Sequence, residues 1–241
     1  MNSKIGVFDS GKGGLTTLNE IKKILPNEDY IYYADSSNNP YGNKTDEALY
    51  NIVTNVVNKL ISKGVKLVVI ACNTATTKCI EKLRKDYPNM LFVGTEPAIK
   101  VACDNNYKNT LVLATPGTIN SERTQELIEK NKRKNQNIYL LPCEGLANAI
   151  ELNDNDKINK LLDKYLNEYT NKNIDSIVLG CTHYPIISEK IQIMFPDAKL
   201  IDGNLGVAKR VKYILEENNL LNTKKENGTI EFIISKLDSI K

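Results

Sequence analysis

The sequence predicts an α/β protein built from two pseudo-symmetric parallel-sheet domains, with an active site in the cleft between them. First, runs of β-branched residues alternate with short turns and helical patterns, which is typical of a parallel sheet covered by helices. Second, the order of these runs repeats after about 107 residues, a period longer than that of solenoid repeats and typical of two domains. The 241 residues are enough for two domains with separate cores.

Four apolar runs of the first half have a counterpart in the second half, and each is expected to be a strand. The pairs are Ile5–Phe8 with Leu111–Ala114, Ile31–Ala34 with Ile138–Leu141, Leu67–Ile70 with Ile177–Leu179, and Leu91–Val93 with Leu200–Ile201. Residue identity between the halves is low, so a duplication and convergence on the same α/β wiring both explain the repeat. We expect the tail to pack on the first half, which makes residues 1–95 and about 208–241 one domain and residues 96–207 the other.

The first half shows the strand–turn–helix alternation most clearly. The strand Ile5–Phe8 runs into a glycine-rich turn, and a helix is predicted over Leu15–Leu25 because Pro26 follows it. A second strand is predicted at Tyr30–Ala34. Residues 45–63 repeat apolar side chains at the spacing of one buried helix face.

In the second half, the turn Ala114–Thr118 takes the position of the glycine-rich turn. Helices are predicted over Glu122–Lys130, Lys157–Tyr169 and about Val207–Glu217. After the turn signal Asn-Gly, a last strand is predicted at Thr229–Ile234.

Composition limits the classes of function and location. The formal net charge is only +3, so charge gives no reason to expect a nucleic-acid partner. No run reaches the roughly 18 apolar residues that a membrane span needs, and the N-terminus lacks a basic-then-apolar signal pattern. We therefore expect a cytoplasmic protein with no membrane partner.

The five cysteines are expected to be reduced thiols, because their number is odd and no export signal is present. None belongs to a C-x-x-C pair, and a single histidine leaves too few soft ligands for zinc, so no metal is expected. Cys79 and Cys103 are expected to be buried small hydrophobes. Cys143 follows an apolar run, which predicts a position near a pocket. No neighbour in the sequence activates its thiol.

Two cysteines occupy equivalent positions directly after strand-like runs. Cys72 is followed by Asn73 and Thr74, and Cys181 is followed by Thr182 and His183. Ligands of open parallel sheets bind beyond the carboxyl ends of the strands. Other polar turns are expected at the same ends, namely Asp9–Ser10, Pro40-Tyr41-Gly42 and Thr115–Thr118.

This pair of thiols favours acid/base chemistry on two faces of one molecule. A lone cysteine at a helix N-terminus is first interpreted as a nucleophile. Two matched thiols can instead remove a proton on one face and return one on the other, which inverts a stereocentre. Asp9 is expected to serve Cys72, and His183 to serve Cys181. Carboxylate and ammonium groups of a substrate would then be bound by Ser10, Asn73, Thr74, Thr182 and the backbone amides of Tyr41 and Gly42.

The chain closely resembles the glutamate racemase family of the aspartate/glutamate racemase superfamily, over nearly its whole length. The segments that carry the resemblance are Gly6–Gly11 with Gly13–Leu15, Tyr33–Asp35 with Pro40–Gly42, Ala71–Thr76, Glu96–Ala98, Ala114–Thr118 and Leu179–Pro185. The resemblance implies a cofactor-independent enzyme that interconverts L- and D-glutamate and supplies D-glutamate for peptidoglycan. It implies no pyridoxal phosphate or other cofactor, and a homodimer among the expected assemblies.

Carried over by position, the resemblance implies that Cys72 and Cys181 are the two acid/base catalysts, with Asp9 and His183 as their partners. It also implies a carboxylate that assists the thiol beside the histidine, for which Glu151 is the first candidate and Glu144 the competitor. Lys12 departs from the family pattern, in which a small apolar residue is usual. The remaining implied contacts with substrate are those of Ser10, Tyr41, Gly42, Asn73, Thr74 and Thr182.

Three alternatives stay open at this point. A racemase of the same superfamily that acts on aspartate or another amino acid would share the two thiols. A non-catalytic amino-acid-binding protein would not need matched thiols and would be expected to have an export signal. A thiol hydrolase would need only one reactive cysteine.

Overall fold

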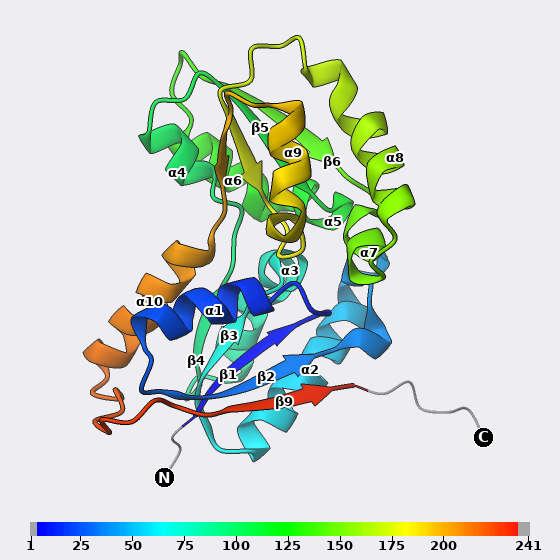
Figure 1. Cartoon of the computed structure of the whole chain (residues 1–241). Coiled ribbons are helices and arrows are strands. Elements are labelled where there is room, and N and C mark those ends of the chain that lie inside the picture. The colour runs from blue at the N-terminus through cyan, green and yellow to red at the C-terminus, as the bar shows by residue number, and fades with distance from the viewer. Residues whose placement is uncertain (1–3, 236–241) are drawn as a thin grey trace, which may run out of the picture. The chain divides into compact units, whose positions relative to one another are not determined.

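The computed structural model describes residues 4–235, and the chain divides into two compact units (Figure 1). One unit comprises the residues up to Thr95 together with those from Asn204 onward. The other unit comprises Glu96–Gly203. Each unit is an α/β structure with one sheet.

The sheet of the first unit has five strands in the order β4-β3-β1-β2-β9, and every pair of neighbours is parallel. The strands are β1 (Lys4–Asp9), β2 (Asp29–Ala34), β3 (Val65–Ile70), β4 (Leu91–Gly94) and β9 (Ile230–Ile234). The helices of this unit are α1 (Leu15–Ile24), α2 (Asp46–Ser62), α3 (Asn73–Asp86) and α10 (Asn204–Glu217). Figure 1 shows β9, in red, beside β2 although nearly 200 residues separate them.

Helices cover both faces of this sheet. Ile5 and Val7 of β1 pack with α1 and α10, whereas Phe8 packs with α2 and α3 on the opposite face. All three side chains are completely buried. Because both faces are covered, the central strands are continuously apolar rather than alternating, which explains why they are recognisable in the sequence.

The sheet of the second unit has four strands in the order β6-β5-β7-β8, again all parallel. They are β5 (Asn109–Ala114), β6 (Asn137–Pro142), β7 (Ser176–Leu179) and β8 (Lys199–Ile201). The helices are α4 (Ile99–Asp104), α5 (Pro116–Ile119), α6 (Glu122–Asn131), α7 (Leu146–Glu151), α8 (Asn155–Leu166) and α9 (Ser188–Met194). Leu111 and Leu113 of β5 pack with α7, α8 and α9, and Val112 packs with α4 and α6.

The predicted fold class, an α/β protein with two parallel sheets, is confirmed. The strand order β4-β3-β1-β2 of the first sheet matches the order β8-β7-β5-β6 of the second, so the repeat in the sequence is a repeat of topology. The single helix predicted over Lys157–Tyr169 is α8 followed by a short 3-10 helix at Asn167–Tyr169. Within residues 4–235, no helix combines the length and the apolar character needed to cross a membrane.

Candidate active site

Cys72 lies between the end of β3 and the first turn of α3. It is the N-cap residue of α3, with extended backbone, and its side chain is 6% exposed. Asn73 and Thr74 are the first two residues of that helix. The first N–H groups of a helix lack partners within it, and together with the helix dipole they favour negative charge. The sequence therefore places the Cys72 thiol at a helix end that favours negative charge.

Asp9 is the last residue of β1, the strand next to β3, and Ser10 follows it. Phe8 is in register with Ile70, and Ala71 N–H donates to the Phe8 carbonyl at 2.9 Å, so the ends of the two strands lie side by side. The Asp9 side chain is fully buried, and its Oδ2 accepts a hydrogen bond from Gly11 N at 3.1 Å. A Cβ atom on Gly14 would come within 2.6 Å of the Asp9 Cβ, which explains why glycine stands there.

The Asn73 side chain carries a buried acceptor that no residue within 4–235 satisfies. Its Oδ1 has no hydrogen-bond partner in that part of the chain, and the residue is 5% exposed. An unsatisfied buried acceptor costs about 1–3 kcal/mol. A bound molecule with an N–H donor, such as an ammonium group, would remove this cost.

Tyr41 lies in a loop of two short 3-10 helices, Ser36–Asn38 and Tyr41–Asn43, which joins β2 to α2. Its hydroxyl donates to Asp35 Oδ2 at 2.7 Å, and Asn38 Nδ2 donates to both oxygens of the same carboxylate. Burial raises the pKa of Tyr41 well above its usual value, so the hydroxyl stays a donor. Asp35 was not among the predicted site residues, although its position directly after a strand is the same signal that identified Asp9.

Cys181 lies after β7 in the second unit and is 7% exposed. Its Sγ is 3.9 Å from His183 Nδ1. His183 Nε2 is in turn 2.7 Å from Glu151 Oε2 at the end of α7, and the imidazole is almost completely buried. Thiol, imidazole and carboxylate thus form a chain through which a proton can be accepted from Cys181 and stabilised.

Glu151, not Glu144, is the carboxylate that contacts the histidine. Glu144 is exposed, and its contact with the Tyr165 hydroxyl is made by its backbone carbonyl. Gly145 has a positive φ of 78°, which ends the segment after β6 and starts α7 at Leu146. Glu151 then lies on the last turn of α7, where it faces His183.

Three threonines of the second unit lie at the ends of two neighbouring strands. Thr115 follows β5 and is the N-cap of α5, where its Oγ1 accepts from Thr118 N at 3.3 Å. Thr182 follows Cys181, and its Oγ1 is 3.5 Å from His183 Nδ1. Because β5 and β7 are adjacent and parallel, these hydroxyls belong to the same edge of the sheet as Cys181.

The other three cysteines are buried thiols of a different character. Burial raises the pKa of Cys79 and of Cys143 to about 12, and it also raises the pKa of Cys103. These thiols therefore stay protonated at neutral pH. All five cysteines are free, as expected for reduced thiols.

The predicted residues thus form two groups, one in each unit. In the first unit Asp9 ends β1, and the partly exposed Lys12 lies in the turn after it. The residues that follow strands of the first sheet are Ser10, Pro40, Tyr41, Gly42, Cys72, Asn73 and Thr74. Glu151, Cys181, Thr182 and His183 belong to the second unit, with Thr115 and Thr118. In the described part of the chain, no group of three or more His, Cys, Asp or Glu side chains is arranged to hold a metal ion.

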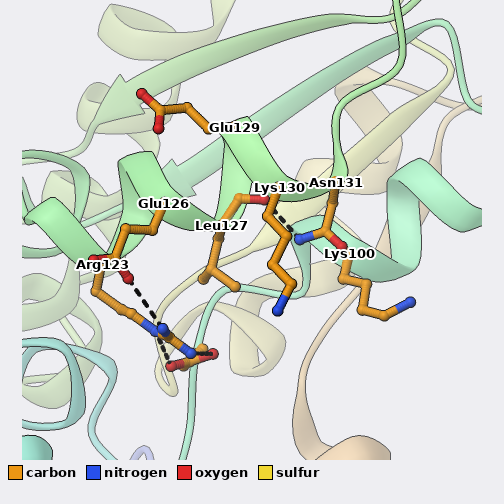
Figure 2. Close-up of a pocket in the computed structure, with 8 residues that line it drawn as sticks. Lys100, Arg123, Glu126, Leu127, Glu129, Lys130 and Asn131 are labelled. Carbon is orange, nitrogen blue, oxygen red and sulfur yellow. Dashed lines mark hydrogen bonds and ion pairs between the residues drawn. The ribbon is translucent and has the colours of Figure 1, made fainter.

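The second unit has a depression of about 740 Å³ (Figure 2), and none of these residues lines it. Its lining includes Arg123, whose guanidinium bonds to Glu96 at 2.6 Å and to Glu126 at 3.1 Å. No thiol lines it, and its strongest charges neutralise one another. It therefore lacks the groups needed for the acid/base chemistry described above.

Comparison with known proteins agrees with this chemistry. The family model described as Asp/Glu/Hydantoin racemase matches residues 15–211. The chain is 42% identical over 238 residues to the glutamate racemase of Clostridium botulinum strain Alaska E43. This match covers 97% of this chain and 92% of the relative. It is 43% identical to the glutamate racemase of Clostridium novyi, covering 98% of this chain and 92% of the relative.

Among solved structures, the glutamate racemase of Francisella tularensis in complex with D-glutamate superimposes with a TM-score of 0.83 at 35% identity. The match covers 99% of this chain and 90% of that chain. A family model that spans most of the chain, relatives of this identity and two strand-end thiols lead to one conclusion: the chain belongs to the Asp/Glu/hydantoin racemase family.

Proposed function

We propose that this chain is a glutamate racemase, which interconverts L- and D-glutamate without a cofactor, with Cys72 and Cys181 as the two acid/base groups. The observation that carries the assignment of the thiols is their equivalence. Cys72 follows β3 and Cys181 follows β7, which hold the same place in two sheets of the same strand order. The relatives named glutamate racemase, about 40% identical over nearly the full length, support the substrate.

In the proposed reaction, one thiolate removes the α-proton of glutamate and the other thiol delivers a proton to the opposite face of the carbanion. The C–H bond breaks on one face and a new C–H bond forms on the other, so the configuration inverts and no electrons are exchanged with a cofactor. The enzyme is left with its two thiols in exchanged protonation states. The proposal requires water to be excluded from the reacting groups.

Each thiol has its own proton-handling partner in this proposal. Asp9 assists Cys72, and His183 assists Cys181 while Glu151 stabilises the imidazolium that forms. The short Glu151–His183 contact of 2.7 Å supports the second assignment. A carboxylate in this position orients the ring and favours its protonated form.

Substrate binding is assigned to polar groups at the strand ends. The unsatisfied Oδ1 of Asn73 supports a contact with the substrate ammonium. The α3 N-terminus, Ser10, Thr74 and the backbone amides of Tyr41 and Gly42 offer donors for carboxylate oxygens, which stabilise the charge that develops when the α-proton leaves. Thr115, Thr118 and Thr182 supply further hydroxyls, and Pro40 shapes the loop.

The cellular role follows from the product. D-glutamate made in the cytoplasm would supply peptidoglycan synthesis. Assembly as a homodimer is part of the same proposal, and sedimentation of the purified protein tests it.

The reaction is tested by incubating L-glutamate with the purified protein in D2O, without pyridoxal phosphate, while circular dichroism and NMR are recorded. We expect optical activity to disappear and, early in the reaction, deuterium to enter the D-glutamate product and not the remaining L-glutamate. Deuterium that appears equally in recovered L-glutamate would contradict two separate acid/base groups. Inversion of aspartate in place of glutamate would contradict the assigned substrate.

A further inference from the structure

Two sets of hydrogen bonds hold the loop between β2 and α2. One is within the loop, and the other joins it to the residue that follows β9, near the C-terminal end of the described chain. The first set is made by the Asp35 carboxylate, which bonds to Tyr41 and Asn38. The second is made by Ser37, whose backbone N–H donates to Ser235 Oγ at 2.9 Å and whose hydroxyl donates to the same atom at 2.7 Å. Ser235 directly follows β9.

Ser235 is itself held in place by the sheet. Its backbone N–H donates to the Ala34 carbonyl at 2.9 Å, and Ala34 is in register with Ile234. The position of its Oγ is therefore set by the pairing of β9 with β2. Two hydrogen bonds to one fixed oxygen restrict both the backbone and the side chain of Ser37.

Little apolar packing supports this side of the loop. A depression of about 470 Å³ borders it, and the lining includes Asp35, Ser37, Asn38 and Ser235. Ser37 and Asn38 are partly exposed. Hydrogen bonds therefore hold residues 36–38, whereas Tyr41 further along the loop is buried in the apolar cluster that contains Cys72.

We propose that Ser235 is a positioning residue, which through Ser37 holds the Tyr41 loop in the conformation that binds substrate. The inference rests on the proposed role of Tyr41 and Gly42 in substrate binding. Without the Ser235 hydroxyl, the loop gains conformational freedom that substrate binding must remove again, and that entropy cost weakens binding. The proton-transfer groups lie on other strand ends, so the chemical step changes little.

Other contacts keep β9 in place when Ser235 is changed. β9 pairs with β2 over five residues, from Ile230 to Ile234. The segment that leads into it is bonded by Asn222 N–H to Glu28 Oε1 and by Lys224 Nζ to Asp29 Oδ2. A Ser235 variant is therefore expected to fold.

The test compares KM and kcat for glutamate in the full chain. We expect Ser235→Ala to raise KM about three- to tenfold, the effect of losing one or two hydrogen bonds, while kcat changes less than about twofold. Ser235→Thr, which keeps the hydroxyl, restores KM. The matched control is Thr229→Val, which removes a 2.8 Å hydrogen bond to Asp29 at the other end of the β9 segment and should leave KM unchanged.

A structural role alone would appear as a lower melting temperature with unchanged KM in Ser235→Ala, and that result would overturn the inference. Gly42→Pro, which removes one of the loop amides assigned to substrate, separates this failure from that of the proposed function. If Gly42→Pro raises KM and Ser235→Ala does not, only the role of Ser235 is wrong. If Gly42→Pro also leaves KM unchanged, the binding role of the loop is wrong, and the inference falls with it.

Discussion

The surroundings of Cys72 and Cys181 share a fold position but differ in chemistry. Cys72 caps the 14-residue helix α3 and has Asp9 on the neighbouring strand. Cys181 is followed by the short 3-10 helix Tyr184–Ile187 and has a histidine–carboxylate pair instead. In the proposed reaction the two enantiomers have equal free energy, and each thiol would have to both accept and release a proton. The comparison teaches that the same position after a strand can be surrounded by different polar partners in the two units.

The two surroundings also have a feature in common. Tyr41 packs in the same apolar cluster as Cys72, and Tyr184 packs in the same cluster as Cys181. Burial raises the pKa of both tyrosines well above the usual value. Each cluster therefore holds, together with its thiol, a tyrosine that stays neutral at working pH.

The largest expected effect is the loss of either thiol. Cys72→Ser and Cys181→Ser should each reduce racemisation by at least about a thousandfold, because a hydroxyl is a far weaker acid than a thiol and cannot replace it in proton transfer. Circular dichroism of glutamate gives the rate, and far-UV spectra verify the fold. Cys103→Ala is the control that should retain activity. Substantial turnover in either serine variant would disprove the two-thiol comparison.

The next largest effect is expected when the partners of Cys181, His183 and Glu151, are changed one at a time. His183→Asn should lower kcat/KM by about a hundredfold or more, and Glu151→Gln by about tenfold. Because the enantiomers have equal free energy, kcat/KM must fall equally in both directions. Since Glu151 acts through the imidazole, Glu151→Gln should have little further effect when His183 is already Asn. Full additivity in this double-mutant cycle would show that Glu151 acts independently.

The rate of alkylation separates the two proposed catalytic thiols from the other cysteines, which are also buried. At about pH 8, iodoacetamide should modify Cys72 and Cys181 several-fold faster than Cys79 and Cys143, whose pKa values of about 12 leave almost no thiolate. Bound glutamate should protect both members of the pair. Peptide mass spectrometry after short exposure measures the rates, and earlier modification of Cys143 than of Cys181 would be inconsistent with these assignments.

The smallest expected effect is on stability and concerns Asp29, which helps to hold β9 in place. β9 is the fifth strand of the first sheet and has no counterpart in the four-stranded second sheet. Hydrogen bonding to Lys224 and to Thr229 N–H lowers the pKa of Asp29 from 3.8 to about 2. As pH falls, the unfolded chain binds this proton first, so the stabilisation is complete above about pH 5 and is lost between about pH 4 and pH 2. Asp29→Asn should cost about 1 kcal/mol near neutral pH, after allowance for solvent screening, and the difference from wild type should shrink in acid.

Urea unfolding at several pH values measures that difference. The exposed Asp163→Asn on α8 is the control, with no comparable loss expected at neutral pH. A difference between Asp29→Asn and wild type that stays constant down to pH 2 would show that the ion pair does not cause it.

The sequence by itself determined the strands of both sheets and the two thiols at their ends. The strands are recognisable because both faces of each sheet are covered, which leaves continuous apolar runs. The proposed site residues at the ends of those runs, such as Asp9, Cys72 and Cys181, follow from the rule that parallel sheets bind ligands at the carboxyl ends of their strands. These inferences need only local patterns and the order of elements.

The tertiary structure decided which side chains meet. Glu144 and Glu151 were both candidates in the sequence, and only the packing of α7 places Glu151 against His183. The Ser37–Ser235 contact joins residues 198 positions apart. Such contacts depend on how elements pack and on the direction in which each side chain leaves its helix or strand. A local pattern does not contain that information, because many distant partners are compatible with the same apolar run or turn.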